Sequence, residues 1–440
     1  MRVGRCAASM RFIPRLLKST AVKTLLAAAF LWLAIFQYCR YRFWRDPHSA
    51  FFNDRSGVYD LGYSLSRERE AHHFITRYNA PTEPPASIKG GADPLFCVAF
   101  VTVRREADDY FDPSIGSLLS GLDPRERRAM HLSILFADTD PTKHPSWGQK
   151  WVGRLADVAN TYNVSESQLN HLKKLEVDRN FYEKGVFDYV YALASCQQSN
   201  APYIVVFEDD IIIADGWMAK TMKALGDIKR RPSDKHKRPW IYLRLFYTET
   251  ALGWESSDFA YRNMPFIFAA VMLLTYICLM AVRRLRPCRS SIDVPTISAI
   301  SVICVPAFIA LVYMTGKYSL APLRGVVEMN PYGCCTQGMV FPKDQVESLI
   351  AYLQARGHGQ TDTMIEEYAE ENRLTRYALV PQQLQHVGLK SSRDNTELNA
   401  QSTWAFYFEQ NKPKLLRKEH DEILLDREIG QLLDKHGSDN

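Results

Sequence analysis

The stretch Tyr203-Ile-Val-Val-Phe-Glu-Asp-Asp-Ile-Ile-Ile213 is the most informative part of the chain, because it places three carboxylates between two apolar runs that resemble strands. Burying Glu208, Asp209 and Asp210 beside such runs is costly unless a cation or strong hydrogen bonds compensate. A hard divalent ion such as Mg²⁺ or Mn²⁺, itself bound to phosphate oxygens, is a natural compensator. The alternative is a solvated strand end that binds nothing, and spacing alone leaves both interpretations open.

Apolar runs and helix-like segments alternate on both sides of this stretch. The expected strands cover residues 96–103, 132–136, 203–207, 240–247 and 339–341. The expected helices cover residues 113–130, 184–198, 343–355, 361–372 and 421–435. This alternation predicts an α/β domain with a largely parallel sheet covered on both faces. Ligands of such sheets bind beyond the carboxyl ends of the strands, which is where the three carboxylates lie.

The net charge of +5 is unremarkable, but its distribution along the chain is uneven. No acidic residue precedes Asp46, and several lysines and arginines precede the apolar run Ala21–Cys39. This run is about long enough to cross a bilayer. A cleaved signal peptide is the alternative, but Phe36, Gln37 and Tyr38 lie where small residues would mark a cleavage site. We therefore expect an uncleaved anchor with a cytosolic N-terminus.

Two further apolar runs, Pro265–Val282 and Val294–Met314, contain no charged residue. Each is long enough to span a bilayer, and the loop 283–292 between them carries four arginines. Such a basic loop is expected to stay in the cytosol. A pair of buried core helices is the alternative, which the four arginines disfavour. A multi-pass transporter is disfavoured as well, because the spans are few and lack intramembrane charges.

These segments predict a protein whose α/β domain is split by a transmembrane hairpin and lies in the lumen. The expected parts are a cytosolic tail (1–20), an anchor (21–39), a stem (40–92), a first domain half (93–262), the hairpin (263–315) and a second domain half (316–440). The stem is expected from its charged stretches and its Pro- and Gly-rich end, with the globular pattern starting at Leu95.

Four of the nine cysteines fall in the predicted lumenal parts: Cys97, Cys196, Cys334 and Cys335. An oxidising lumen permits disulfides among them, although the sequence does not determine their pairing. The sequon that starts at Asn163 lies on the same predicted side.

The acidic stretch is followed along the chain by Gly357-His358-Gly359 with Asp362, and by Leu384-Gln385-His386-Val387-Gly388. In this order, and with a transmembrane hairpin inside the catalytic domain, the chain resembles the Golgi GPI-anchor N-acetylgalactosaminyltransferase family, whose fold is that of GT-A glycosyltransferases. The likeness to N-acetylglucosaminyltransferase IV enzymes is weaker. The resemblance covers the anchor, the hairpin and the segments from about residue 95 onward.

The resemblance implies a nucleotide-sugar donor, UDP-N-acetylgalactosamine, whose diphosphate is held by Mn²⁺ or Mg²⁺. It implies that Asp210 ligates the metal, that Glu208 and Asp209 face the ribose and the sugar, and that His386 is a further metal ligand. A divalent cation stabilises the charge that the diphosphate gains as the glycosidic bond breaks. Without the resemblance, His386 would be read as a structural or surface histidine.

Inverting enzymes of this type also need a carboxylate beside the acceptor hydroxyl. We expect Asp362 as the catalytic base, with Glu366 as the second choice. The alternative is that both acids simply favour the first turn of a helix.

The donor side involves the end of the first expected strand. There Thr102, Val103 and Arg104 would lie against the nucleobase and ribose. Lys184 would neutralise a phosphate, unless it is an ordinary exposed helix lysine.

The function expected from the resemblance is transfer of N-acetylgalactosamine, with inversion, to the core mannose of a GPI anchor at the Golgi membrane. The partners would be GPI-anchored proteins or the GPI glycan and the membrane, with no nucleic acid. Two alternatives remain open: an N-glycan branching N-acetylglucosaminyltransferase, and a non-catalytic receptor for GPI proteins with a degenerate GT-A domain.

Overall fold

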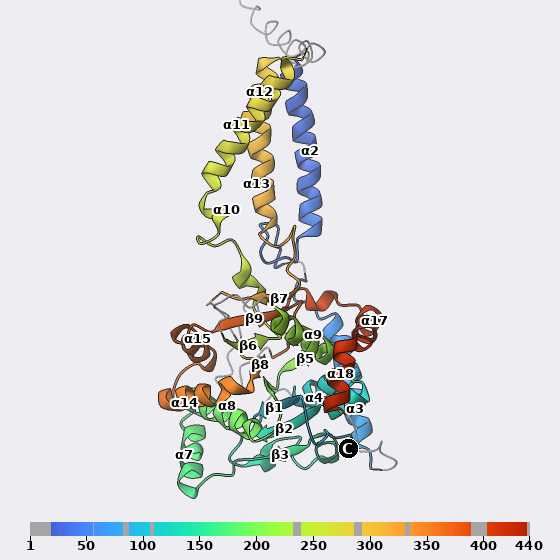
Figure 1. The fold of residues 1–440 in the computed structure, drawn as a ribbon, viewed down its shortest axis with the longest axis vertical. Helices are drawn as coiled ribbons and strands as arrows, with labels where there is room; N and C mark the ends of the chain where they lie inside the picture. Colours follow the sequence, from blue (N-terminus) through green and yellow to red (C-terminus); the bar gives the residue numbers. More distant parts are fainter. Residues whose placement is uncertain are drawn as a thin grey trace, which may run out of the picture. The chain divides into compact units, whose positions relative to one another are not determined.

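The computed structural model describes residues 19–55, 57–81, 88–105, 110–231, 239–285, 293–330, 335–388 and 403–437. The chain forms two compact units, each built from two separate stretches of sequence (Figure 1). One unit comprises Met1–Val58 and Leu252–Pro322, and the other comprises Tyr59–Ala251 and Leu323–Asn440.

The larger unit is α/β and is built on a mixed sheet. Among the described residues this sheet has eight strands, in the order β3-β2-β1-β4-β8-β6-β9-β7. The strands are β1 (Phe96–Thr102), β2 (Met130–Phe136), β3 (Val158–Asn160), β4 (Tyr203–Phe207), β6 (Trp240–Arg244), β7 (Gly325–Glu328), β8 (Gly338–Pro342) and β9 (Thr375–Val380).

Strand direction changes in the middle of this sheet. The strands β3, β2, β1 and β4 are mutually parallel, whereas β8 runs antiparallel to both of its neighbours, β4 and β6. The β6–β9 pair is parallel and the β9–β7 pair is antiparallel. Gly338 pairs with Phe207 at the carboxyl end of β4, where a Cβ atom would come within 2.9 Å of the Phe207 ring. The expectation of a largely parallel sheet is therefore wrong for this half, because apolar runs predict strands but not their direction.

A second sheet, of two strands, brings residues of the candidate site together. It consists of β5 (Ile211–Ile213) paired antiparallel with β10 (Leu384–His386). Its register places His386 opposite Ile211. Two segments far apart in the sequence, the acidic triplet and the Gln-His-Val-Gly segment, are thereby brought together.

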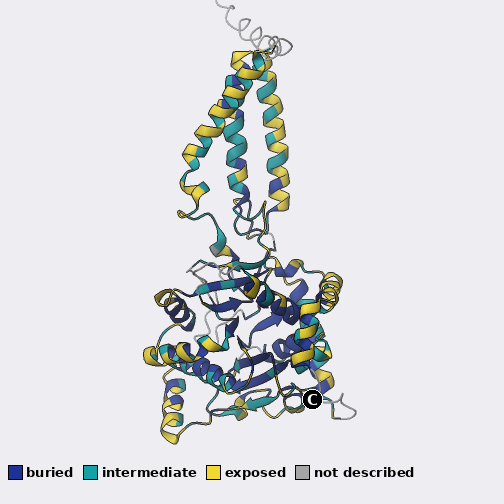
Figure 2. Ribbon diagram, in the orientation of Figure 1, coloured by how far each residue is buried: buried dark blue, intermediate teal, exposed yellow. Residues whose placement is uncertain are grey.

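Helices cover both faces of the large sheet, as the alternation predicted (Figures 1 and 2). The helices α4 and α9 contribute to one apolar cluster, and α8, α14 and α15 contribute to the other. The helices of this unit are α3 (Tyr63–Asn79), α4 (Phe111–Leu119), α5 (Pro124–Arg128), α6 (Lys150–Leu155), α7 (Glu166–Val177), α8 (Phe181–Gln197), α9 (Trp217–Arg230), α14 (Lys343–Arg356), α15 (Thr361–Glu371), α17 (Pro413–Leu424) and α18 (Arg427–His436).

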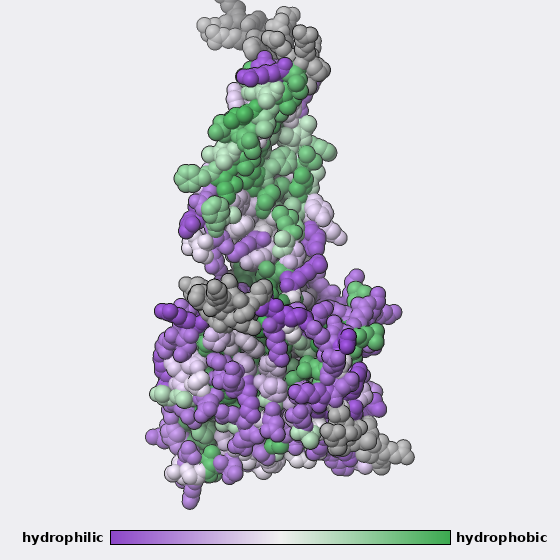
Figure 3. All heavy atoms as spheres, in the orientation of Figure 1, coloured by the Kyte–Doolittle hydropathy of each residue, from purple (hydrophilic) through white to green (hydrophobic). Residues whose placement is uncertain are grey.

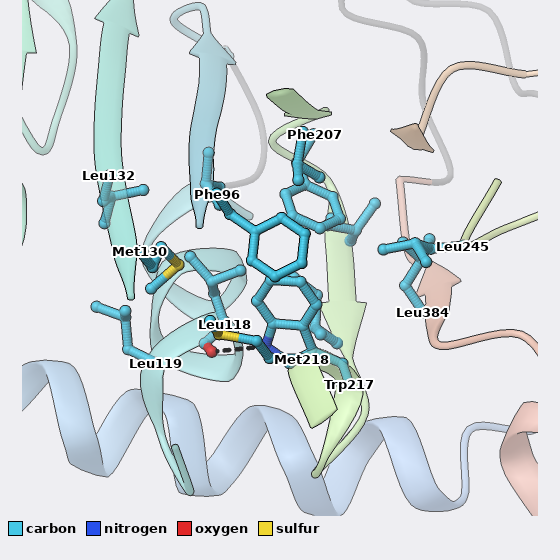
Figure 4. Close-up of a cluster of buried hydrophobic side chains, with 14 of the residues drawn as sticks. Phe96, Leu118, Leu119, Met130, Leu132, Phe207, Trp217, Met218, Leu245 and Leu384 are labelled. Atoms are coloured by element: carbon cyan, nitrogen blue, oxygen red, sulfur yellow. Dashed lines mark hydrogen bonds between the residues drawn. The ribbon is translucent and has the colours of Figure 1, made fainter. Parts of the chain in front are cut away.

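Alternate residues of β1 contribute to the two apolar clusters, because successive side chains of a strand point to opposite faces of the sheet. Phe96 belongs to one cluster, whereas Cys97 belongs to the other. Figure 4 shows the first cluster, in which Phe96, Phe207 and Trp217 gather between the sheet and its helices. The indole of Trp217 donates a hydrogen bond to the carbonyl of Leu118 at 3.0 Å, so this large ring is buried without an unsatisfied donor.

Three helical segments differ from the expectation, each for a local reason. The expected stem contains α3, which packs on α4, so the compact unit begins well before Leu95. The expected helix 113–130 is divided by Asp123 and Pro124, which start α5 with a capping box. The expected helix 421–435 is two helices, because Asp426 caps the start of α18 and leaves Leu425 85% exposed.

Two of the four cysteines singled out in the sequence are joined. A disulfide links Cys97 in β1 to Cys196 in α8, with Cα atoms 5.6 Å apart. Cys335 is also disulfide-bonded. Cys334 lies outside the described residues.

The smaller unit is helical and strongly apolar (Figure 3). Its segments are α2 (Thr20–Arg42), α10 (Phe259–Arg262), α11 (Met264–Arg283), α12 (Val294–Ala299), a π-helical turn (Ile300–Cys304) and α13 (Val305–Thr315). Thr20–Arg42, Met264–Arg283 and Val294–Thr315 are each long and apolar enough to cross a membrane, at the positions that the sequence predicted. The indole of Trp32 donates to the carbonyl of Ala307 at 3.0 Å, which links the first segment to the third.

Candidate active site

The acidic triplet lies where β4 ends and β5 begins, at the wall of a cleft of about 550 Å³. Most of the site residues predicted from the sequence line this cleft: Val103, Arg104, Lys184, Glu208, Asp209, Asp210, Asp362 and His386. Thr102 lies behind Asp209 and donates a hydrogen bond to it. Glu366 is not among the lining residues. The fold thus gathers all but one of these residues at one place.

Asp210 is buried and is held from two sides. Its Oδ2 atom lies 3.2 Å from Nε2 of His386 and 2.9 Å from Nη2 of Arg105. Its Oδ1 atom is buried without a hydrogen-bond partner among the described residues. Burial alone would raise the pKa of Asp210, but His386 and Arg105 outweigh it and lower the pKa below the ordinary value. A buried carboxylate with one unused oxygen is thus kept ionised.

His386 is likewise buried rather than at the surface. Burial would lower its pKa, but the negative charges of Asp210 and Glu208 prevail, so the pKa is raised. The ligand atoms of Glu208, Asp210 and His386 all lie within 4.8 Å of one another. Two carboxylates and an imidazole suit a divalent ion such as Mn²⁺, and the unused Asp210 oxygen offers a ligand atom, so this set fits a metal.

Asp209 points toward the end of β1. Its Oδ2 atom accepts hydrogen bonds from the Thr102 hydroxyl at 2.8 Å and from the Val103 backbone N–H at 3.3 Å, and its Oδ1 atom lies 2.5 Å from Arg105. Glu208 is half-buried and accepts a hydrogen bond from the hydroxyl of Thr336 at 2.5 Å. The three neighbouring carboxylates therefore have three different environments.

Lys184 is not an exposed helix lysine. It is buried, and its ammonium group contacts Asp188 at 3.0 Å, the Tyr162 hydroxyl at 2.8 Å and the Ala137 carbonyl at 2.5 Å. Glu176 lies 3.7 Å away. The charge of Lys184 is thus already compensated by protein groups.

The two candidate bases have opposite surroundings. Asp362 is only partly buried at the start of α15 and lines the cleft, where it accepts a hydrogen bond from the Cys335 backbone N–H at 3.1 Å. Glu366 is buried between Arg244 at 2.6 Å and Arg376 at 2.8 Å. The carboxylate of Glu366 is thus already paired with two protein cations, and Glu366 does not line the cleft.

Two candidate functional residues, Arg105 and Asp138, were not predicted from the sequence. Arg105 bridges Asp209 and Asp210, and Asp138 follows β2 at the carboxyl edge of the sheet and lines the cleft. Burial raises the pKa of Asp138 to about 6, although the backbone N–H of Arg104 opposes the shift. The position of Asp138 directly after a strand could have indicated it, whereas nothing in the sequence distinguished Arg105 from Arg104.

The chain matches a known protein family over most of the larger unit. A family model described as GPI-N-acetylgalactosamine transferase PGAP4 matches residues 96–385. The match begins at the first residue of β1 and includes the acidic triplet, the segment Leu252–Pro322 and Asp362. Because it covers well over half of the chain, the protein belongs to the GPI-N-acetylgalactosamine transferase PGAP4 family.

Proposed function

We propose that this protein is a metal-dependent, inverting glycosyltransferase that moves N-acetylgalactosamine from UDP-N-acetylgalactosamine to the core mannose of a GPI anchor in the Golgi. Membership of the PGAP4 family supports the GPI-directed transfer. The observation that carries the mechanism is the convergence of Glu208, Asp210 and His386 in a cleft at the carboxyl edge of the sheet. We assign the larger unit to the GT-A type on the same grounds.

Glu208, Asp210 and His386 would hold the ion, Mn²⁺ or Mg²⁺. When bound, the ion would supply positive charge beside the departing diphosphate. Asp209 is fixed by Thr102 and Val103 at the end of β1, and we assign it to the ribose and sugar of the donor. Arg104 lies at the same end of β1 and in the same cleft, next to the space proposed for the nucleobase.

The acceptor hydroxyl needs a base on the side of the cleft formed by α15. We assign this role to Asp362, which lines the cleft. Glu366 is not assigned it, because its carboxylate forms ion pairs with two arginines. The acceptor oxygen attacks the anomeric carbon as the bond to the diphosphate breaks, and its proton passes to the carboxylate of Asp362. Attack from the face opposite the leaving group inverts the α-linked donor to a β-linked product.

The helical unit has a role in reaching the acceptor. The chain passes between the two units three times, after Val58, after Ala251 and after Pro322. If the apolar helices span the membrane with the helical insertion as a hairpin, these connections tether the catalytic unit close to the bilayer that carries the GPI glycan. Tethering raises the effective concentration of the acceptor without any new contact.

The proposal is tested by mass spectrometry of GPI glycans from cells that lack this protein. Wild type should restore a side-chain N-acetylhexosamine on the GPI core, and Asp210→Ala should not. Asp434→Ala is the matched control, because this aspartate is 71% exposed in α18 of the same unit. Restoration by Asp210→Ala would favour a non-catalytic receptor. An unchanged GPI profile in the deficient cells would direct the search to N-glycans.

A further inference from the structure

Arg105 contacts two of the three carboxylates of the acidic triplet. Its Nη2 atom lies 2.5 Å from Oδ1 of Asp209 and 2.9 Å from Oδ2 of Asp210, so one nitrogen bridges two carboxylates. Its side chain is only 13% exposed. Two neighbouring buried carboxylates repel each other unless a cation lies between them, and here the cation is part of the chain.

The same contacts oppose an incoming metal ion. Oδ2 of Asp210 already accepts from both Arg105 and His386, so its lone pairs are used by protein donors. A divalent ion held by Glu208, Asp210 and His386 would lie within a few ångströms of the guanidinium group, because Arg105 contacts one of the ligands directly. Two cations at that separation disfavour each other, and burial weakens the screening by water.

We propose that Arg105 is a built-in counter-cation, which stabilises the carboxylates while the site is free of metal and competes with the divalent ion for them. This inference rests on the proposed metal site and adds to it a residue that sets how tightly the ion binds. Arg105 therefore weakens metal binding, which is the opposite of what a residue that merely supports the ligands would do.

The competition is tested on the full-length protein in detergent, by titrating Mn²⁺ and measuring the free ion by electron paramagnetic resonance. Arg105→Gln should bind Mn²⁺ about tenfold more tightly than wild type, because it removes a positive charge next to a ligand. Arg427→Gln is the control for charge alone, since it removes the same charge from an exposed position in α18 of the same unit, and its affinity should change less than about threefold. Arg105→Lys retains the charge and should stay near wild type.

Thermal unfolding gives a second readout that does not depend on activity. In the presence of a chelator, Arg105→Gln should unfold at a lower temperature than wild type, because the carboxylates lose their counter-cation. Saturating Mn²⁺ should raise the unfolding temperature of the variant by more than that of wild type. If the variant lacks a cooperative transition without metal, its recovery in Mn²⁺ supports the proposal and failure to recover overturns it.

The outcomes separate this inference from the proposed function. Equal or weaker Mn²⁺ binding by Arg105→Gln, with wild type binding normally, overturns the competition and leaves the metal site intact. Absence of Mn²⁺ binding in every protein removes both the metal site and the competition.

Discussion

Backbone contacts from Val387 and Gly388 position Asp210, in addition to the charges around its carboxylate. The N–H of Val387 donates to the carbonyl of Asp210 at 2.9 Å, and Gly388 passes so close that a Cβ atom would lie 2.2 Å from Oδ2 of Asp210. The glycine in Gln-His-Val-Gly is thus required by close approach to the carboxylate. The pairing of β5 with β10 holds this segment in register.

Gly388→Ala should displace the Asp210 carboxylate. We expect Mn²⁺ affinity to fall at least about tenfold and the free energy of unfolding to fall by about 1–3 kcal/mol, as for other overpacked sites. Mn²⁺ titration and chemical unfolding check both values. Gly430→Ala is the control, because nothing lies within 4 Å of a Cβ atom there, and it should be neutral or slightly stabilising. Normal Mn²⁺ binding by Gly388→Ala would show that the close approach of Gly388 does not position the Asp210 carboxylate.

Asp362 and Glu366 differ in what they contribute, although they lie one helical turn apart. Asp362→Asn should lower kcat at least about 100-fold while leaving the unfolding midpoint nearly unchanged, because the amide retains an acceptor oxygen but not basicity. Glu366→Gln should lower the free energy of unfolding by about 3 kcal/mol, because Arg244 and Arg376 lose their buried partner. Steady-state kinetics and denaturant titration of both variants distinguish the roles. A kinetic defect in Glu366→Gln with normal stability would reverse the assignment.

At the scale of elements, a buried ion pair joins α17 to α5. Nε2 of His420 lies 2.9 Å from Oε2 of Glu126, which is fully buried. Burial would lower the pKa of His420, but the hydrogen bond to Glu126 and the nearby carboxylates raise it. The folded protein therefore holds this proton more tightly than the unfolded chain does.

The sign of the pH dependence follows from that difference. The stabilisation by His420 is complete below its unfolded pKa of about 6.5 and is lost as the pH rises through the higher folded pKa. Wild type should lose unfolding free energy as the pH rises above about 6.5, and His420→Gln should show a flatter profile over the same range. Thermal unfolding across this range measures both. Identical slopes for the two proteins would exclude His420 as the source.

The sequence predicted an element well where the buried residues of that element are apolar, and poorly where they include a charged residue. The strand 203–207 and the helix beginning at Lys343 were predicted almost to the residue, since both have a plain apolar pattern. The helix α3 was missed because its buried stripe contains Arg67, whose guanidinium bonds to the carbonyl oxygens of Ile213 and Ser117. A buried arginine that serves backbone carbonyls is indistinguishable from a surface charge in a sequence.

The candidate site, too, was predicted only in part from the sequence. The chemistry of Asp210 and His386 was predicted from residue types and from the resemblance, and the structure places both together. The burial of Lys184 depends on the contact of α8 with the end of β2, and the bridging position of Arg105 depends on the pairing of β1 with β4. No local pattern in the sequence encodes these contacts.

For the whole molecule, the central feature is that Leu252–Pro322 interrupts the α/β unit and belongs to the helical one. Each half of the site depends on this return of the chain, because the acidic triplet precedes the interruption and His386 follows it. The catalytic unit must therefore assemble across the insertion.

Replacing Leu252–Pro322 with a flexible polar linker tests whether the insertion serves acceptor access. We expect transfer to a water-soluble acceptor glycan to remain within about threefold of wild type, and transfer to GPI in membranes to fall at least about tenfold. Parallel assays with the two acceptors give the ratio. Equal retention of both activities would mean that the insertion only adds anchoring.

The proposed activity is measured directly as transfer by the purified full-length protein from UDP-N-acetylgalactosamine to a GPI core glycan, with the product analysed by mass spectrometry and NMR. We expect a β-linked N-acetylgalactosamine on a core mannose, formed only with a divalent ion and lost in Asp210→Asn. A wild-type rate no greater than that of Asp210→Asn, or a product that forms undiminished in a chelator, would contradict this expectation.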